Sequence, residues 1–171
     1  MFENPTISIE ELPAVDKIDF SPLEKEYQQY QFFNWIIRSI IYLLGATLFL
    51  LVTGLFTDIV ISLSAYSLII LFIIARGVVI YKGFPFKGYA IRTFDVTYKT
   101  GWLWKNLISV PFNRIQHVSM GQGFLEKGFN LAHIKVFTAG GDSSDLSIPG
   151  LRPEDATRLK EFITNKIKER E

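Results

Sequence analysis

The sequence has no cysteine and only two histidines among its 171 residues. The absence of cysteine excludes disulfides, thiol catalysis and thiolate metal sites, and it suits a reducing compartment. His117 and His133 have no cluster of further ligands at metal-binding spacing, and in our strand assignment both point away from the apolar core. We therefore expect no metal and no cofactor.

Signatures of catalysis are missing as well. The chain contains no nucleophile elbow, Walker loop or dinucleotide fingerprint. Gly121-Gln122-Gly123 does not lie between a strand and a helix, so we interpret it as a bulge or loop. Asp95 and Glu126 are isolated carboxylates, which is weak support for acid–base chemistry. We expect no enzymatic activity and no small-molecule substrate, and the modest basic excess without a known module excludes nucleic acid.

Charge is absent from the middle of the chain. Nineteen residues from Ser39 to Thr57 carry none, and seventeen more from Ile59 to Ala75 carry none, with Asp58 between the runs. A bilayer core of about 30 Å needs about 20 helical residues. The pattern predicts a transmembrane hairpin within residues 35–82.

We expect its spans at about 36–57 and 59–81, with Gly54, Thr57 and Asp58 in a tight turn. One very long helix is the alternative. The polar groups within the spans are hydroxyls, which commonly join helix to helix, so the spans are expected to anchor the chain rather than to transport.

Basic residues gather at one end of the predicted hairpin. Lys25 and Arg38 precede the first span, and Arg76, Lys82 and Lys87 follow the second. Short loops rich in Lys and Arg stay in the cytoplasm. We therefore expect a multi-pass protein of the cell membrane with both termini cytoplasmic.

The two ends of the chain differ in charge. Residues 1–34 carry two basic and seven acidic groups, a balance of −5, whereas residues 77–171 carry fourteen basic and nine acidic groups, a balance of +5. Residues 1–34 are expected to form an acidic tail and an interfacial helix that begins at Ser21-Pro22 and has Glu24 at N3. The acidic start and the late first apolar run indicate no secretory signal peptide.

Residues 84–171 are predicted to form a soluble domain. Short apolar and β-branched runs broken by glycine, asparagine and proline indicate strands, at Ala90–Tyr98, Leu107–Phe112, Ile115–Met120, Leu131–Thr138 and Leu146–Ile148, with turns at Gly101 and Gly140-Gly141-Asp142. A final helix begins at Pro153 and carries an apolar stripe of Ala156, Leu159, Phe162, Ile163 and Ile167. Such a stripe needs a sheet to cover, so the class is α+β: a small antiparallel barrel or sandwich capped by a C-terminal helix.

Several short motifs give this domain a family resemblance. They are Pro111 with Arg114-Ile115-Gln116 and Val118, then Gln122-Gly123-Phe124-Leu125-Glu126-Lys127, Leu131-Ala132, Thr138-Ala139-Gly140-Gly141 and Ile148-Pro149-Gly150-Leu151. As a set they resemble the bacterial pleckstrin-homology-like (PH) domain of YdbS-like membrane proteins, which also carry two spans ahead of the domain. Phe124, Lys127 and Asn130 depart from the family pattern. The resemblance implies a seven-stranded, helix-capped barrel, no catalytic residues, and a role in assembly.

Two groups of residues are candidate binding sites. Arg114 and Gln116 alternate along a predicted strand and so share a face, where Arg114 either pairs with a lipid phosphate or a partner carboxylate, or holds the loop that contains Glu126. Trp102, Trp104 and Lys105 follow the turn at Gly101. The tryptophans either pack on the core, dip into the bilayer interface, or contact a partner.

Two functions fit these features. The first is a membrane-anchored interaction module whose partner is another membrane protein, or a copy of itself. The alternative is a domain that senses anionic membrane lipids at the inner surface, which rests on the basic balance and on analogy with animal domains of this fold.

Overall fold

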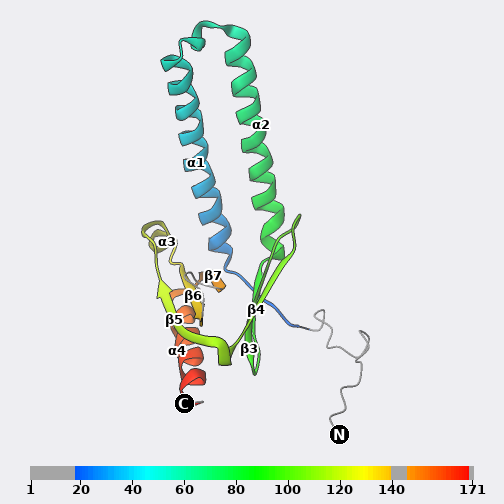
Figure 1. Ribbon diagram of the computed structural model, residues 1–171, viewed down its shortest axis with the longest axis vertical. Coiled ribbons are helices and arrows are strands. Elements are labelled where there is room, and N and C mark those ends of the chain that lie inside the picture. Colours follow the sequence, from blue (N-terminus) through cyan, green and yellow to red (C-terminus); the bar gives the residue numbers. More distant parts are fainter. Residues whose placement is uncertain (1–17, 140–145, 170–171) are drawn as a thin grey trace, which may run out of the picture.

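Two long antiparallel helices rise from a small α+β domain in the computed structural model, which describes residues 18–139 and 146–169 (Figure 1). The helices are α1, Lys25–Val52, and α2, Ile59–Gly83. Both are long and apolar enough to cross a membrane, and almost none of their most apolar stretches is buried within the protein. The first seventeen residues of the acidic tail and the turn expected at Gly140-Gly141-Asp142 lie outside the described residues.

The turn between the helices explains where each one stops. Gly54 adopts the left-handed conformation, with a φ of 73°, and ends α1 earlier than the predicted position 57. A 3-10 turn, Leu55–Thr57, leads to Asp58, whose carboxylate accepts hydrogen bonds from the amides of Val60 and Ile61 and so caps α2. The single-helix alternative is therefore wrong.

Contacts along the hairpin fix its register. Near the domain, the Trp35 indole donates to the carbonyl of Ile73 at 3.0 Å, and its ring lies so close to Gly77 that an added Cβ would meet it at 3.0 Å. Further along, the hydroxyls of Thr47 and Tyr66 are 2.9 Å apart. These two contacts fix which residues of α1 lie opposite which residues of α2.

Two antiparallel sheets make up the domain. The first has the order β1-β2-β3-β4 and the second β5-β6-β7. Their bounds are Ser21–Pro22 for β1, Gly88–Ile91 for β2, Asp95–Thr100 for β3, Asn106–Pro111 for β4, Ile115–Gly121 for β5, Ala132–Thr138 for β6 and Leu146–Leu151 for β7. A short helix α3, Phe124–Gly128, joins β5 to β6, and α4, Pro153–Lys168, follows β7.

One apolar core joins both sheets and α4. Val96 and Val110 reach it from the first sheet, and fully buried Ile134 and Ile148 from the second. On α4, Ala156, Leu159 and Ile163 are buried, as the apolar stripe predicted, and Phe162 is 41% exposed. The helix covers β5 and β6, so the predicted α+β class with a C-terminal helical cap is confirmed.

The helix start predicted at Ser21-Pro22 is wrong. These two residues form β1 and pair with Tyr89 and Gly88 of β2. Leu23, which follows, is only 4% exposed and belongs to the domain core. The cap pattern failed because strand pairing and burial outweigh a local helix signal. Residues before the first span thus complete the domain that follows the second.

The strand predicted at Ala90–Tyr98 is two strands. β2 and β3 pair as a hairpin, and the amide of Arg92 donates to the carbonyl of Asp95 across its turn. The connection after β3 does turn at Gly101, as predicted. The prediction that Gly121-Gln122-Gly123 does not lie between a strand and a helix is wrong: Gly121 ends β5, residues 122–123 are the loop, and α3 follows directly.

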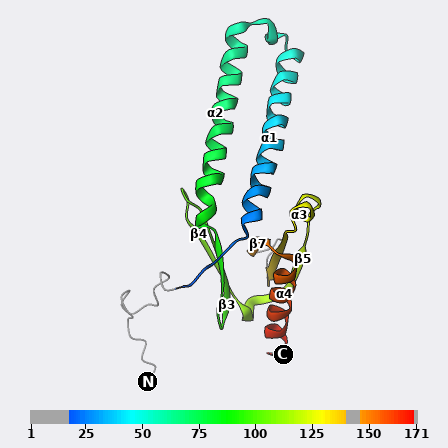
Figure 2. The ribbon, with the colours of Figure 1, turned by 180° about the vertical axis from the view of Figure 1, so that it is seen from behind.

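The helices join the domain through a close backbone approach. The amide of Glu24 donates to the carbonyl of Gly150 at 3.1 Å. Gly150 has a φ of 68°, and a Cβ built there would lie 2.4 Å from Cγ of Tyr27 on α1. Only glycine meets both demands. The first turn of α1 therefore lies directly on β7, and the anchor and the domain form one body (Figure 2).

Candidate functional site

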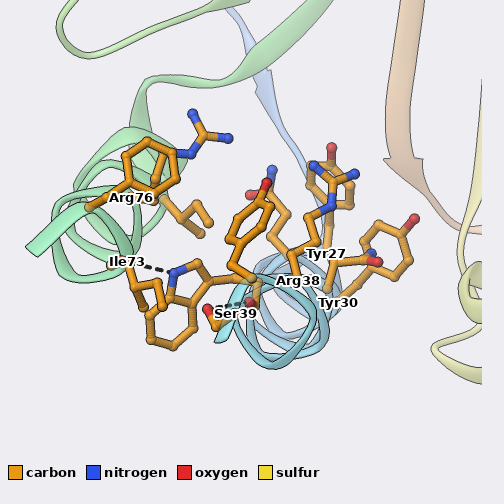
Figure 3. A pocket seen from close by; sticks show the side chains of 12 residues that line it. Tyr27, Tyr30, Arg38, Ser39, Ile73 and Arg76 are labelled. Atoms are coloured by element: carbon orange, nitrogen blue, oxygen red, sulfur yellow. Dashed lines mark hydrogen bonds between the residues drawn. The ribbon is translucent and has the colours of Figure 1, made fainter. Parts of the chain in front are cut away.

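A pocket opens between α1 and α2, just beyond the domain. Its volume is about 300 Å3, at the lower end of the range for ligand sites. Aromatic, amide and guanidinium groups dominate its walls, which are formed by Tyr27, Tyr30, Gln31, Asn34, Trp35, Arg38, Ser39, Tyr42, Phe72, Ile73, Arg76 and Ile80. Figure 3 shows Arg38 on α1 and Arg76 on α2 on opposite sides of this pocket.

Two of the polar side chains that line the pocket form hydrogen bonds within the helical hairpin. The Trp35 indole donates to Ile73, and the Ser39 hydroxyl donates to the carbonyl of Trp35 at 2.7 Å. Arg38 and Arg76 are different: within residues 18–139 and 146–169, neither guanidinium has a hydrogen-bond or ion-pair partner. The pocket therefore carries two uncompensated positive charges.

Gln31 contributes a second unusual group. Its Oε1 is buried and has no hydrogen-bond partner among the described residues. A buried acceptor without a donor is destabilising. Because this oxygen is shielded from the pocket, the wall presents the unpaired guanidinium donors of the two arginines but no open acceptor from Gln31.

The tryptophan group lies on the connection between β3 and β4. Trp102 packs at the end of α2, with the Lys82 ammonium 5.3 Å from its ring centre. Trp104 is 82% exposed and Leu103 is 56% exposed. The two tryptophans do not share a strand face, because residues 101–105 are a bend, and core packing is wrong for Trp104. Lys105 lies next to it, also exposed.

Arg114 and Gln116 do not share a strand face either. Arg114 ends a 3-10 turn, Phe112–Arg114, whereas Gln116 lies in β5 beside a bulge. Both side chains are exposed. β4 separates them from Trp104 by about 20 Å at roughly 3.3 Å per residue. The predicted binding residues therefore fall in two separate places.

The loop that contains Glu126 is held by other residues than Arg114. Glu126 is 8% exposed, and its Oε2 accepts from the amide of Gly123 at 2.7 Å. The same oxygen lies 2.8 Å from Nδ1 of His133. The interpretation in which Arg114 holds this loop is wrong, because a nearer histidine on β6 supplies the partner.

The histidines occupy different surroundings. His117 is exposed and stacks on Phe137 at 4.3 Å between ring centres, whereas the side chain of His133 is 22% exposed and packs against Glu126. Among the described residues, no three His, Asp or Glu side chains gather as metal ligands would. Asp95 pairs with Arg92 on the first sheet, far from Glu126, so the two carboxylates form no acid–base pair.

Comparison with known proteins identifies the fold. The model of the family described as "Bacterial PH domain" matches residues 39–167, which is most of the chain. The chain belongs to the bacterial PH domain family. The match begins within α1 and includes α2 and strands β2 to β7, so the protein is a membrane protein with a bacterial PH domain.

The chain is also similar to one transmembrane protein in sequence and, more weakly, to one solved structure. The UPF0699 transmembrane protein YdbS of Bacillus subtilis (strain 168) is 36% identical over 76 residues, which is 44% of this chain and 46% of that protein. The match thus spans less than half of the relative's length. A crystal structure of a DUF1696 family protein with a pleckstrin-homology domain, from Shewanella loihica PV-4, is 14% identical and covers 47% of this chain and 70% of that one, with a TM-score of 0.38.

Sequence reasoning missed the pocket between the helices. Arg38 and Arg76 were visible as the charges that bound the two spans, but they were interpreted only as topology signals. A signal was present: in an antiparallel hairpin with its turn at residues 53–58, these two positions fall opposite each other. No sequence signal marks Gln31, because its burial depends on how α1 meets the domain.

Proposed function

We propose that the protein is a non-enzymatic, membrane-anchored interaction module that joins a partner membrane protein in a complex. Gly45 carries this proposal. It lies in the middle of α1, where glycine destabilises a helix by about 1 kcal/mol relative to alanine. An added Cβ would meet nothing within 4 Å, so packing inside the hairpin does not explain it. Gly77, by contrast, is explained by the Trp35 ring.

The surroundings of Gly45 suit a helix from another protein. It lines an apolar groove of about 790 Å3 between α1 and α2, together with Ala46, Ala65 and larger apolar side chains. Small residues let transmembrane helices approach closely, which is the main source of association inside a bilayer. The occupant we propose is a transmembrane helix of the partner.

Orientation is part of the proposal. Pairing between β1 and β2 keeps both helix ends that enter the domain on one side of the bilayer. Lys25, Lys82 and Lys87 lie at that end. The excess of basic residues in short loops supports the cytoplasmic side.

Filling the groove tests this function. The tagged full-length protein, its Gly45→Leu variant and its Leu44→Phe variant would be captured from solubilised native membranes and analysed by mass spectrometry. Leu44 is 64% exposed outside the groove, so enlarging it is the matched control. One stoichiometric membrane protein should accompany the wild type and Leu44→Phe, and Gly45→Leu should lose it. A lone monomer, or only a second copy, would contradict the proposal.

A second candidate function, contact with anionic lipid, is favoured by the exposed aromatic residues. Trp104 is 82% exposed on the connection between β3 and β4, and Phe124, 92% exposed, is the first residue of α3. One end of the β3–β4 hairpin lies beside the domain end of α2, and α3 lies near the base of α1 (Figure 1). Tryptophan favours the headgroup level, and Lys105 adds a positive charge there.

Brominated lipids test the contact of Trp104. In vesicles of anionic lipid brominated near the headgroup, tryptophan emission of the full-length protein should be quenched, and Trp104→Phe should lose a large part of that quenching. Trp102→Phe is the control, because Trp102 packs against Lys82. Equal quenching in vesicles of neutral lipid would contradict the proposed preference for anionic lipid.

A further inference from the structure

The two arginines of the pocket lie at the same depth. Contacts between Trp35 and Gly77, and between Thr47 and Tyr66, set the antiparallel register of the hairpin. In that register Arg38 falls opposite Arg76. Two guanidinium groups from facing helices thus flank one cavity (Figure 3).

Nothing in the described part of the chain neutralises this pair. No Asp or Glu lines the pocket, and neither arginine has a partner among residues 18–139 and 146–169. Like charges that face one another repel, and more strongly next to a low-dielectric bilayer. An anion between them would offset the repulsion and accept charge-assisted hydrogen bonds from both planar guanidinium groups.

The depth of the pocket points to a lipid. Arg38 is about 21 Å from the end of α1, at roughly 1.5 Å per residue, and the hydrocarbon core is about 30 Å thick. These values place the Arg38 backbone about 9 Å inside the core, from where its long side chain extends toward the boundary at which the lipid phosphates lie. Basic pockets between transmembrane helices suit anionic headgroups.

The remaining lining groups indicate what the phosphate carries. The Asn34 amide and the Tyr30 hydroxyl lie in the same wall. Both can hydrogen-bond a headgroup that carries hydroxyls, which a bare phosphate monoester lacks. Below the arginines, Tyr42 and Phe72 pack edge to face at 6.0 Å and present apolar surface to an acyl chain.

We propose that this pocket binds one anionic glycerophospholipid, with its phosphate between Arg38 and Arg76 and its headgroup hydroxyls against the amide of Asn34. The lipid site is centred on the arginines at the domain end of the hairpin, whereas the partner-protein groove is centred on Gly45, and the two adjoin at Tyr42 and Phe72. The lipid would fix the spacing of the two helices where they enter the domain.

Native mass spectrometry of the full-length protein tests the proposal. The protein would be released from mixed micelles that contain equal amounts of phosphatidylglycerol and phosphatidylcholine. Wild type should retain one phosphatidylglycerol. Arg38→Gln with Arg76→Gln should lower the affinity for phosphatidylglycerol roughly a hundredfold, since each of the two lost charge-assisted contacts is worth about a factor of ten. Arg158→Gln with Lys160→Gln removes equal charge from the exposed face of α4 and should change nothing.

Two further arms separate the alternatives. Asn34→Leu should lose the preference for phosphatidylglycerol over phosphatidic acid while keeping a bound lipid. If the glutamine pair does not fold, Arg38→Lys with Arg76→Lys replaces it and should bind with intermediate strength. Inorganic phosphate at millimolar concentration should not displace the lipid. Equal retention by wild type and the glutamine pair would overturn the proposal. Full displacement of the lipid by phosphate would also overturn it, because it would show that the pocket binds a free anion.

Discussion

At the scale of single residues, a polar network holds the hairpin of β2 and β3. Asp95 accepts hydrogen bonds from the Arg92 guanidinium and from the Ser109 hydroxyl at 2.7 Å, and Thr97 donates to Ser109 at 2.9 Å. Partial burial alone would raise the pKa of Asp95, but the hydrogen bonds from Arg92 and Ser109 and the charge of Arg92 outweigh it and lower that pKa.

This network predicts a pH dependence. A carboxyl whose pKa is lowered by folding stabilises the folded state above its unfolded pKa of about 3.9, and that contribution is lost as the pH falls through the folded value. Asp95→Asn should therefore unfold with a weaker dependence on pH below about 5. The loss at neutral pH should be about 1 kcal/mol or less, because Arg92 is exposed.

Thermal unfolding in mild detergent at a series of pH values measures the effect. Asp155→Asn is the control, since its contact with Arg158 is 4.0 Å long and exposed. Identical pH profiles for wild type and Asp95→Asn would show that the network adds nothing.

The same residues show what sequence reasoning misses. Arg114 and Glu126 both belong to the family motifs and are predicted partners, yet Glu126 is paired with His133 and Arg114 is exposed at the end of a 3-10 turn. Pairing within a sheet depends on register and on bulges, such as the one between Ile115 and His117. A local sequence pattern determines neither the register nor the bulge.

At the scale of elements, Asp58 decides where α2 begins. Its carboxylate accepts from two of the otherwise unpaired amides of the first turn, Val60 and Ile61, at 3.0 and 3.1 Å. Asp58→Ala should destabilise the hairpin by about 1 kcal/mol, and Asp58→Asn should stay close to wild type because asparagine caps equally well. Loss of helical circular dichroism with added SDS in mixed micelles reports the difference. Equal losses in both variants would point to the charge rather than to the cap.

The elements themselves were predictable to different degrees. The helices followed from two uncharged runs broken by a turn, and β4 to β7 from short apolar runs. The strand predicted at Ala90–Tyr98 was wrong because no glycine or proline marks its turn, which depends on Arg92 and Asp95 instead. β1 was missed because its partner, β2, lies beyond both helices.

At the scale of the whole molecule, the chain before the helices completes the domain after them. Leu23→Ala should lower the free energy of unfolding by roughly 2–5 kcal/mol, as for other buried leucines. Leu44→Ala, on the outer face of α1, should change it little. Thermal unfolding followed by tryptophan emission would compare them. A small effect at Leu23 would mean that residues 84–171 fold without the strand from the other end.

The pairing of β1 with β2 also sets an order of events during synthesis. Ser21 and Pro22 leave the ribosome first and have no partner until both helices have been made. Closing so long a loop through an open chain would be slow, because the entropy of closure must be overcome before any contact forms. A hairpin already inserted in the bilayer brings the two ends together in advance. Membrane insertion would then act as the folding step of the domain, and a chain that fails to insert would keep its core open at Leu23.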